Sequence, residues 1–153
     1  MGVELPNLII NFMKKQGFVV VSSFDSQGKI HCSAKGIVGI DSEKVFLIDL
    51  YKARTYKNLN KNHNVTISFI DEHKFAGYAL QGKAKIVEKE KIKKNLIAEW
   101  EEKVLQRISQ RVVENLHEGK TGEHHPEASF PHPKYLIELD IEKIIDLAPS
   151  VRK

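Results

Sequence analysis

Short apolar runs alternate with turn-forming residues over the N-terminal two thirds of the chain. These runs are rich in β-branched and aromatic residues, which favour extended structure. Turns of about four residues join the first three runs, and connections this short require antiparallel pairing. The pattern predicts five strands, at 18–24, 29–40, 45–50, 64–70 and 75–88. Gly77 and Gly82 interrupt the last of them, which indicates a bulge or a close backbone approach.

Three other segments show helical spacing of their apolar residues. Residues 4–15 predict a helix that ends at Gly17, and 51–62 allow a short helix. Over 89–117 the apolar residues recur every four positions, and this spacing drifts by ~40° per step on a straight helix. We therefore expect a bend or break near 101–107, or a helix that wraps around the rest of the protein.

The C-terminal part begins with a loop rich in glycine and proline at 118–133. Alternating residues at 134–140 predict a last strand, and 141–147 fit a further strand or a helical turn. Six to seven antiparallel strands in one small chain favour a closed or partly closed barrel, because closure removes free edges. We expect one domain over 1–153, mostly β with helices (α+β), with the long helix after strand five.

Composition and charge indicate the class of protein and the cellular compartment that this domain fits. Hydrophobic residues make up 41% of the chain and charged residues 29%, as in globular proteins. No apolar run approaches the ~20 residues that cross a bilayer, and the N-terminal segment has the reverse of a signal peptide's charge order. The one cysteine, Cys32, suits a reducing compartment. We expect a cytoplasmic protein with no membrane contact.

The most concentrated candidate chemistry is a basic stretch directly after the third strand, KARTYK at 52–57. A helix that starts there would present unpaired N–H groups and a partial positive charge. With the guanidinium of Arg54 and the hydroxyl of Thr55, these groups suit a phosphate monoester. The alternative is a solvated basic surface, and these residues alone leave both interpretations open.

The second strand carries Ser33, Ala34, Lys35 and Gly36 at its centre. Glycine within a strand lets a flat ligand lie close to the backbone. Lys35, among apolar neighbours, could then contact an anionic or carbonyl edge of such a ligand. The alternative is an ordinary barrel strand whose residues alternate between inside and outside.

In their order and spacing these segments resemble the flavin-binding split-barrel family that includes pyridoxamine 5'-phosphate oxidase and small proteins that bind flavin mononucleotide (FMN). The resemblance covers residues 8–88 and rests on three stretches: FVVVSSFDSQGKIHCSAKG, VFLIDLYKARTYKNLNKNHNVTISFI and GYALQGKAKIV. It implies a split β-barrel with FMN as cofactor. By this resemblance Arg54 and Thr55 hold the FMN phosphate, with Lys57 as an additional charge.

The resemblance also implies which residues line the flavin ring and the ribityl chain. These are Ser33, Ala34 and Lys35 on the second strand, with Ile48 and Asp49 on its neighbour. In the family the flavin lies at a homodimer interface, so the fifth strand around 77–81 is expected to approach the partner's flavin. Redox transfer through the flavin is then the expected activity. Lys35 is the candidate for stabilising the anionic reduced flavin.

The sequence departs from the oxidase in one respect that bears on substrate. The oxidase has a C-terminal Arg and His that hold the pyridoxal phosphate, and the end ELDIEKIIDLAPSVRK contains no matching Arg-x-His. We therefore expect an oxidoreductase whose substrate is not pyridoxine phosphate, with a small molecule or NAD(P)H as electron donor. No catalytic residue can be named from the sequence.

Several alternatives remain open at this stage. The protein could be a flavin- or haem-binding or stress module without turnover, or could use a deazaflavin in place of FMN. A nucleic-acid-binding barrel fits the net charge of +4, but only Tyr51 and Tyr56 lie among the basic residues, and a stacking surface needs more aromatics. We therefore expect no nucleic-acid partner.

Histidines and carboxylates gather late in the chain. The histidines are His117, His124, His125 and His132. Such ligands suit zinc or iron, but their spacing matches no standard motif. We therefore expect no metal site.

Overall fold

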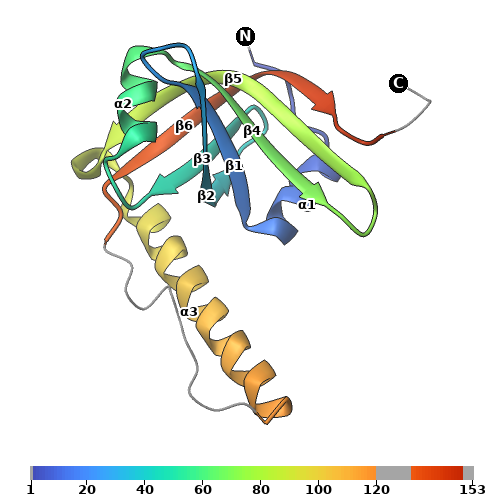
Figure 1. Ribbon diagram of the computed structural model, residues 1–153. Coiled ribbons are helices and arrows are strands. Elements are labelled where there is room, and N and C mark those ends of the chain that lie inside the picture. Colours follow the sequence, from blue (N-terminus) through green and yellow to red (C-terminus); the bar gives the residue numbers. More distant parts are fainter. Residues whose placement is uncertain (1, 120–131, 150–153) are drawn as a thin grey trace.

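The computed structural model describes residues 2–119 and 132–149. Six antiparallel strands close into a barrel in the order β1-β2-β3-β6-β5-β4 (Figure 1). The strands are β1 Phe18–Phe24, β2 Ile30–Ile40, β3 Lys44–Asp49, β4 Asn64–Asp71, β5 Ala76–Glu88 and β6 Tyr135–Asp146. The expected α+β split barrel is thus confirmed. β6 runs on through 141–146, so of the two expectations for this segment the strand is confirmed.

Alternation along each strand decides what lies inside the barrel. Val19 and Val21 of β1 point inward, as do Tyr135, Ile137 and Leu139 of β6, and all are almost fully buried. Residues directly opposite each other on antiparallel strands share a face. Ser33 and Lys35 pair with Val21 and Val19, so these two polar residues also face inward.

Two short helices close the ends of the barrel. α1, Asn7–Gln16, precedes β1 and contributes Ile9 and Met13 to the core. α2, Arg54–Lys61, lies at the opposite end of β1 and contributes Leu59 (Figure 1). Because α2 follows directly on β3, the basic stretch is held at the end of the barrel toward which Ser33 and Asp49 lie.

The expected irregularity at Gly82 is confirmed. The β5–β6 register shifts between Gln81 and Gly82, and a Cβ at Gly82 would lie 1.8 Å from the Asp140 carbonyl oxygen. Only glycine allows the two strands to approach this closely. The resulting bulge bends the long β5 strand, as closure of a small barrel requires.

The long helix differs from the expectation. A 3₁₀ turn, η1 Lys89–Lys91, leads into α3, which is continuous over Lys94–His117, so the expected break near 101–107 is wrong. α3 does not wrap around the barrel either: its first half packs on the outer side of β2 and β3, and its second half extends away from the barrel (Figure 1). The apolar stripe drifts around α3, and the contact between this helix and the barrel ends after the first half of the helix.

Trp100 fixes α3 to the barrel. It is buried against Val38, Ile48 and Leu136, and a Cβ added at Gly36 of β2 would lie 2.4 Å from its ring. Gly36 therefore provides the space into which the indole fits.

Gly36→Ala is expected to displace Trp100 and to lower the free energy of unfolding by about 1–3 kcal/mol, the usual effect of overpacking. Trp100 is the one tryptophan, so its fluorescence emission should shift to the red. Gly39→Ala in the same strand is the control, because the nearest atom to its added Cβ lies 3.4 Å away. Equal stability of the two variants, measured by urea unfolding, would contradict this account.

Candidate functional site

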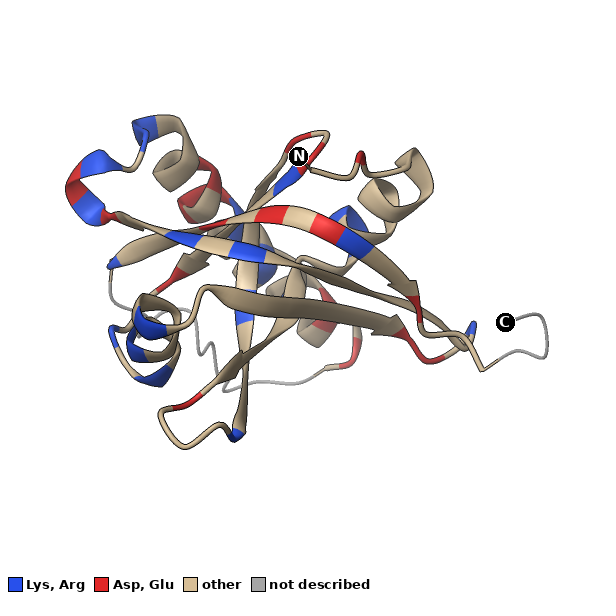
Figure 2. Cartoon of the chain, turned by 90° about the horizontal axis from the view of Figure 1, so that it is seen from above, with Lys and Arg blue, Asp and Glu red and all other residues tan. Residues whose placement is uncertain are grey.

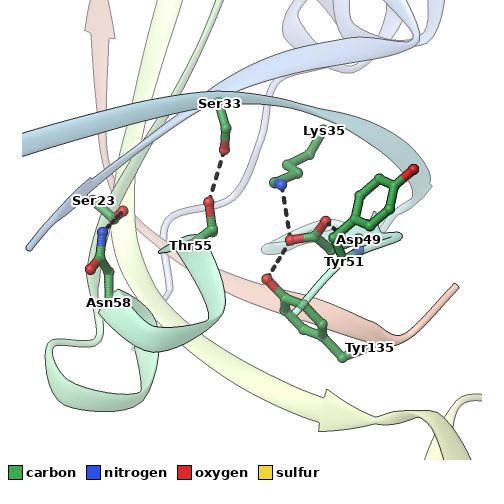
Figure 3. Close-up of polar contacts among 8 residues, drawn as sticks. All are labelled: Ser23, Ser33, Lys35, Asp49, Tyr51, Thr55, Asn58 and Tyr135. Atoms are coloured by element: carbon green, nitrogen blue, oxygen red, sulfur yellow. Dashed lines mark hydrogen bonds and ion pairs between the residues drawn. The ribbon is translucent and has the colours of Figure 1, made fainter. Parts of the chain in front are cut away.

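Four of the residues predicted from the sequence come together where α2 covers the barrel. They are Ser33 and Lys35 from β2, Asp49 from the end of β3 and Thr55 from the first turn of α2 (Figure 3). Asp49 and Thr55 are each 3% exposed, and the two β2 residues are half-buried. We call this group the barrel-end cluster. Its members approach from three separate elements, so only the folded chain brings them together.

Asp49 is the centre of the cluster. Its Oδ2 lies 2.9 Å from the Lys35 ammonium and also accepts a hydrogen bond from the hydroxyl of Tyr135 on β6. Its Oδ1 accepts a hydrogen bond from the backbone N–H of Tyr51 at 3.3 Å. Burial, and then the hydrogen bond to Asp49, raise the pKa of Tyr135 far above its usual value. The phenol therefore remains a proton donor to the carboxylate over the whole physiological range.

A second group of bonds holds α2 against the barrel. The Ser33 and Thr55 hydroxyls lie 2.9 Å apart, and the Asn58 side-chain amide donates to Ser23 Oγ at 3.2 Å. Asn58 and Ser23 are both buried. One turn of α2 thus binds β1 and β2 through side chains, which fixes the direction in which the other face of the helix points.

That other face carries the basic residues. Arg54 and Lys57 are exposed on α2. The eight residues of this helix contain no acid, so it carries blue but no red in Figure 2. Ala53, at the N-cap, has no side chain that could bond to the first N–H groups of the helix. Exposed cations thus stand beside uncapped backbone donors, which is the donor set that an anion requires at a helix start.

The remaining two predicted residues lie outside the barrel-end cluster. Ala34 is exposed on the outer face of β2. Ile48 is buried on the outer side of β3, where it packs beneath α3 with Trp100. Strand alternation separates both from their neighbours Lys35 and Asp49.

The connection between β3 and α2 is also tied to β5. Glu88 pairs with Lys52 at 2.8 Å and accepts a hydrogen bond from the Tyr56 hydroxyl at 2.6 Å. Lys52 lowers the pKa of Glu88 through this hydrogen bond, and Glu88 raises the pKa of Lys52. Both groups are well exposed, so solvent screens the attraction between them. The main effect of the pair is to fix the position of the connection between β3 and α2.

Sequence reasoning missed three members of this region: Tyr135, Asn58 and Ser23. For Tyr135 a signal was present, because the alternation of KYLIELD places it on the same face as Ile137 and Leu139. For Asn58 the helical spacing from Thr55 would have placed it on the buried side of α2. Nothing in the sequence pairs Asn58 with Ser23, since their contact depends on the tertiary fold.

The structure describes only part of the histidine-rich segment. His124 and His125 lie outside the described residues. Over 2–119 and 132–149, no three histidine, cysteine or carboxylate side chains come together as metal ligands. In the same ranges, no helix has both the length and the apolar character needed to span a bilayer.

Comparison with known protein families matches residues 6–147 to the pyridoxamine 5'-phosphate oxidase family. The match covers nearly the whole chain, and the protein belongs to this family. A search of curated proteins finds no match.

Solved structures share the fold at low identity. HupZ of Group A Streptococcus has a TM-score of 0.63 and 16% identity over 95% of this chain and 97% of its own. A Clostridium acetobutylicum protein related to general stress protein 26 of B. subtilis (pyridoxinephosphate oxidase family) has 0.56 and 18% over 93% of both chains. An F420 reductase has 0.58 and 13% over 92% of this chain and 98% of its own. At such identities the likeness shows the fold alone.

The raised pKa of Tyr135 leads to a prediction about alkaline stability. Above the usual tyrosine pKa of about 10, the unfolded chain loses this proton and the folded chain keeps it. The free energy of unfolding should then fall by about 1.4 kcal/mol for each further pH unit because of this one group. Tyr135→Phe should be less stable than the wild type at neutral pH and should lack this part of the slope.

Urea unfolding between pH 8 and about 11 measures both slopes. The two proteins share every other ionisable side chain, so the difference between their slopes isolates Tyr135. Parallel stability curves for the two proteins would show that Tyr135 is not held protonated in the folded state.

Proposed function

We propose that the protein binds FMN at the start of α2 and acts as a flavin-dependent oxidoreductase. The observation that carries this proposal is the arrangement of α2, whose inner face is fixed by the barrel-end cluster while Arg54 and Lys57 stay exposed beside uncapped N–H groups. Membership of the pyridoxamine 5'-phosphate oxidase family supports the choice of a flavin. The lack of a C-terminal Arg-x-His favours a substrate other than pyridoxine phosphate.

The residues present fit a phosphate monoester. Arg54 offers a planar fork of donors, Lys57 lies close by on the same helix, and the first turn adds backbone N–H groups. Thr55 Oγ1 faces Ser33, so in this proposal the Thr55 side chain holds the helix start in place. Its backbone N–H belongs to the first turn that would face the phosphate.

The barrel-end cluster would set the electrostatics beside the ring. FMN supplies the electron-transfer chemistry, and the protein supplies position and charge. Lys35 remains our candidate for a donor to the reduced ring, but Asp49, 2.9 Å away, offsets its positive charge. The pair can therefore donate a hydrogen bond while it adds little net field. Buried Tyr135 fixes the carboxylate that orients this ammonium.

A deazaflavin is the second candidate cofactor, and the structural similarity to an F420 reductase favours it. Both cofactors combine a phosphate with a tricyclic ring, so the α2 site suits either. The visible absorption spectrum of the purified protein separates them, and it also reveals haem by its Soret band.

Arg54→Gln is expected to weaken FMN binding about tenfold or more, because it removes charge-assisted hydrogen bonds to the phosphate. Lys61→Gln is the matched control: it removes one positive charge from the same helix, but at the last turn. Quenching of flavin fluorescence measures both affinities. Equal affinities in the two variants would show that the phosphate does not bind at the start of α2.

We further propose that two copies of the chain pair through the outer face of β1, β2 and β4. Exposed apolar side chains gather there: Val20, Phe24, Ile30 and Ile70. A groove of about 340 Å³ lies at the Phe24 and Ile30 end of this face, and Gln81 of β5 also lines it. Burial of these side chains would supply the free energy of association, and it would bring the fifth strand of one copy toward the flavin of the other.

Ile30→Lys should convert this dimer to a monomer, because it places a charge in the apolar face. Leu116→Lys is the matched control, since Leu116 is 71% and Ile30 69% exposed and Leu116 lies near the end of α3, which extends away from the barrel. Light scattering after gel filtration gives the mass of each. A monomeric wild-type protein, or a dimer that survives Ile30→Lys, would contradict the proposed interface.

A further inference from the structure

A lysine amine that the proposed flavin site does not use lies between α1 and α3. Lys103 of α3 lines a cleft of about 480 Å³ there, together with Gly17 and Trp100. This volume is within the range of pockets that bind small molecules. The cleft adjoins the end of α1, and α1 and α2 lie at opposite ends of the barrel (Figure 1).

Lys103 differs from the other half-buried lysines in what its side-chain nitrogen contacts. Among the described residues three lysines are half-buried, and two of them, Lys35 and Lys44, form ion pairs with carboxylates. Lys103 forms no ion pair in this part of the chain. Its Nζ donates instead to the Ile37 carbonyl oxygen at 2.6 Å. A neutral carbonyl favours the charged form of the amine less than a carboxylate does.

The backbone around Ile37 holds this nitrogen in place. The β2–β3 register is interrupted between Ile37 and Gly39, and the Ile37 N–H bonds to the Gly17 carbonyl oxygen at 2.9 Å. Ile37 is therefore fixed where β2 meets the end of α1. Its carbonyl engages one of the three ammonium protons of Lys103, so two protons remain for chemistry at the nitrogen.

The surroundings of Lys103 favour the uncharged amine. Burial lowers the pKa of Lys103, and Glu99, one turn earlier on α3, opposes the shift. The other charged groups of the lining are Lys14, Lys15, Arg107, Arg111 and Glu114. Four of these five are cations, so positive charge predominates around the amine. Desolvation and neighbouring cations are the two means by which proteins activate a lysine as a nucleophile.

The remaining residues of the lining indicate a polar, negatively charged ligand. The side-chain amides of Gln16, Gln106 and Gln110 offer hydrogen-bond donors and acceptors. Lys14 and Lys15, exposed at the end of α1, add positive charge at the edge of the cleft. A small molecule that carries a carboxylate fits this lining better than an apolar one.

We propose that the Lys103 amine forms a reversible imine with a small aldehyde that carries a carboxylate and enters this cleft. The ammonium first loses a proton to water, and the nitrogen lone pair then forms a bond to the aldehyde carbon. The resulting carbinolamine is protonated on oxygen, and the C–O bond breaks with its electron pair to release water.

The product keeps the contact that positions the amine. In the balance, an ammonium and an aldehyde give a protonated imine and water, with no change in oxidation state. Two ammonium protons leave in the water, and the third stays on the nitrogen, where it donates to the Ile37 carbonyl as before. No other charged group of the lining takes part in the step.

Reductive trapping of the full-length wild-type protein tests this site. Glyoxylate is the probe, sodium cyanoborohydride converts each imine to a stable amine, and mass spectrometry of proteolytic peptides gives the labelling rate at each lysine. Lys103 should react several-fold faster than Lys29, which is exposed on the β1–β2 turn. Lys44, whose ammonium pairs with two carboxylates, should react more slowly than Lys29. A rate at Lys103 no higher than at either of these lysines would overturn the proposal.

Propanal in place of glyoxylate tests the preference for a carboxylate. The labelling rate at Lys29 corrects for the intrinsic reactivity of each aldehyde. The ratio of the Lys103 rate to the Lys29 rate should be several-fold higher with glyoxylate than with propanal. Equal ratios would overturn the choice of an aldehyde that carries a carboxylate.

Lys103→Met should abolish the adduct on α3 and a second signal with it. Trp100 is the one tryptophan and lines the cleft, so glyoxylate without reductant should change its emission, and dilution should reverse the change. Lys29→Met is the matched control and should keep both the emission change and its reversal. The same emission change in Lys103→Met would overturn the proposal. The wild-type trapping rates decide the question even where Lys103→Met does not fold.

Arg54→Gln separates this site from the flavin site. It should leave the labelling rate of Lys103 unchanged, because Arg54 lies on α2. A several-fold lower rate in this variant would connect the aldehyde to the α2 site and overturn the inference, whatever the outcome for FMN.

Discussion

The buried carboxylate of Asp49 is the constraint on which the candidate site depends. A carboxylate removed from water is strongly unfavourable unless charge and hydrogen bonds compensate it. Here the compensation comes from Lys35 on β2 and Tyr135 on β6, the two strands that flank β3. Loss of one partner from such a buried pair typically destabilises a protein by about 3–5 kcal/mol, even where the intact pair adds little net stability. The pair therefore contributes mainly to the specificity of strand register. A shift of β2 or β6 by one residue would leave Asp49 unpaired inside the barrel.

The same constraint explains how α2 is oriented. Asp49 is the last residue of β3, and it bonds to the backbone N–H of Tyr51, so the chain leaves the barrel in a fixed direction. Four residues later Thr55 meets Ser33, and one turn further on Asn58 meets Ser23. The polar side chains on the inner face of α2, Thr55 and Asn58, thereby form hydrogen bonds with the barrel. Arg54 and Lys57 must then point outward, where they are exposed to solvent and take no part in the core.

Much of the fold follows from local pattern. Strand bounds from the sequence agree with the structure within one or two residues for β1 to β5, because β-branched runs and short turns are local signals. The cluster was only partly predictable. Resemblance to a family identified Lys35 and Asp49, yet their mutual pairing and the role of Tyr135 depend on the closure of β3 against β6. The expected break in α3 was wrong because a drifting apolar stripe also fits a straight helix that packs over only half of its length.

That partial packing of α3 also brings two cations of the helix against the barrel. Trp100 seats the helix on Gly36, and beyond it Lys103 and Arg107 still reach the barrel through the Ile37 carbonyl and the Phe18 ring. β2 therefore contributes to both regions. Its side chains at Ser33 and Lys35 face the barrel end beneath α2, and its interrupted ladder two residues further on offers a carbonyl to α3. A strand with unbroken pairing on both sides has no such carbonyl to offer, so the bulge in β2 is what allows one strand to position cations on two sides of the barrel.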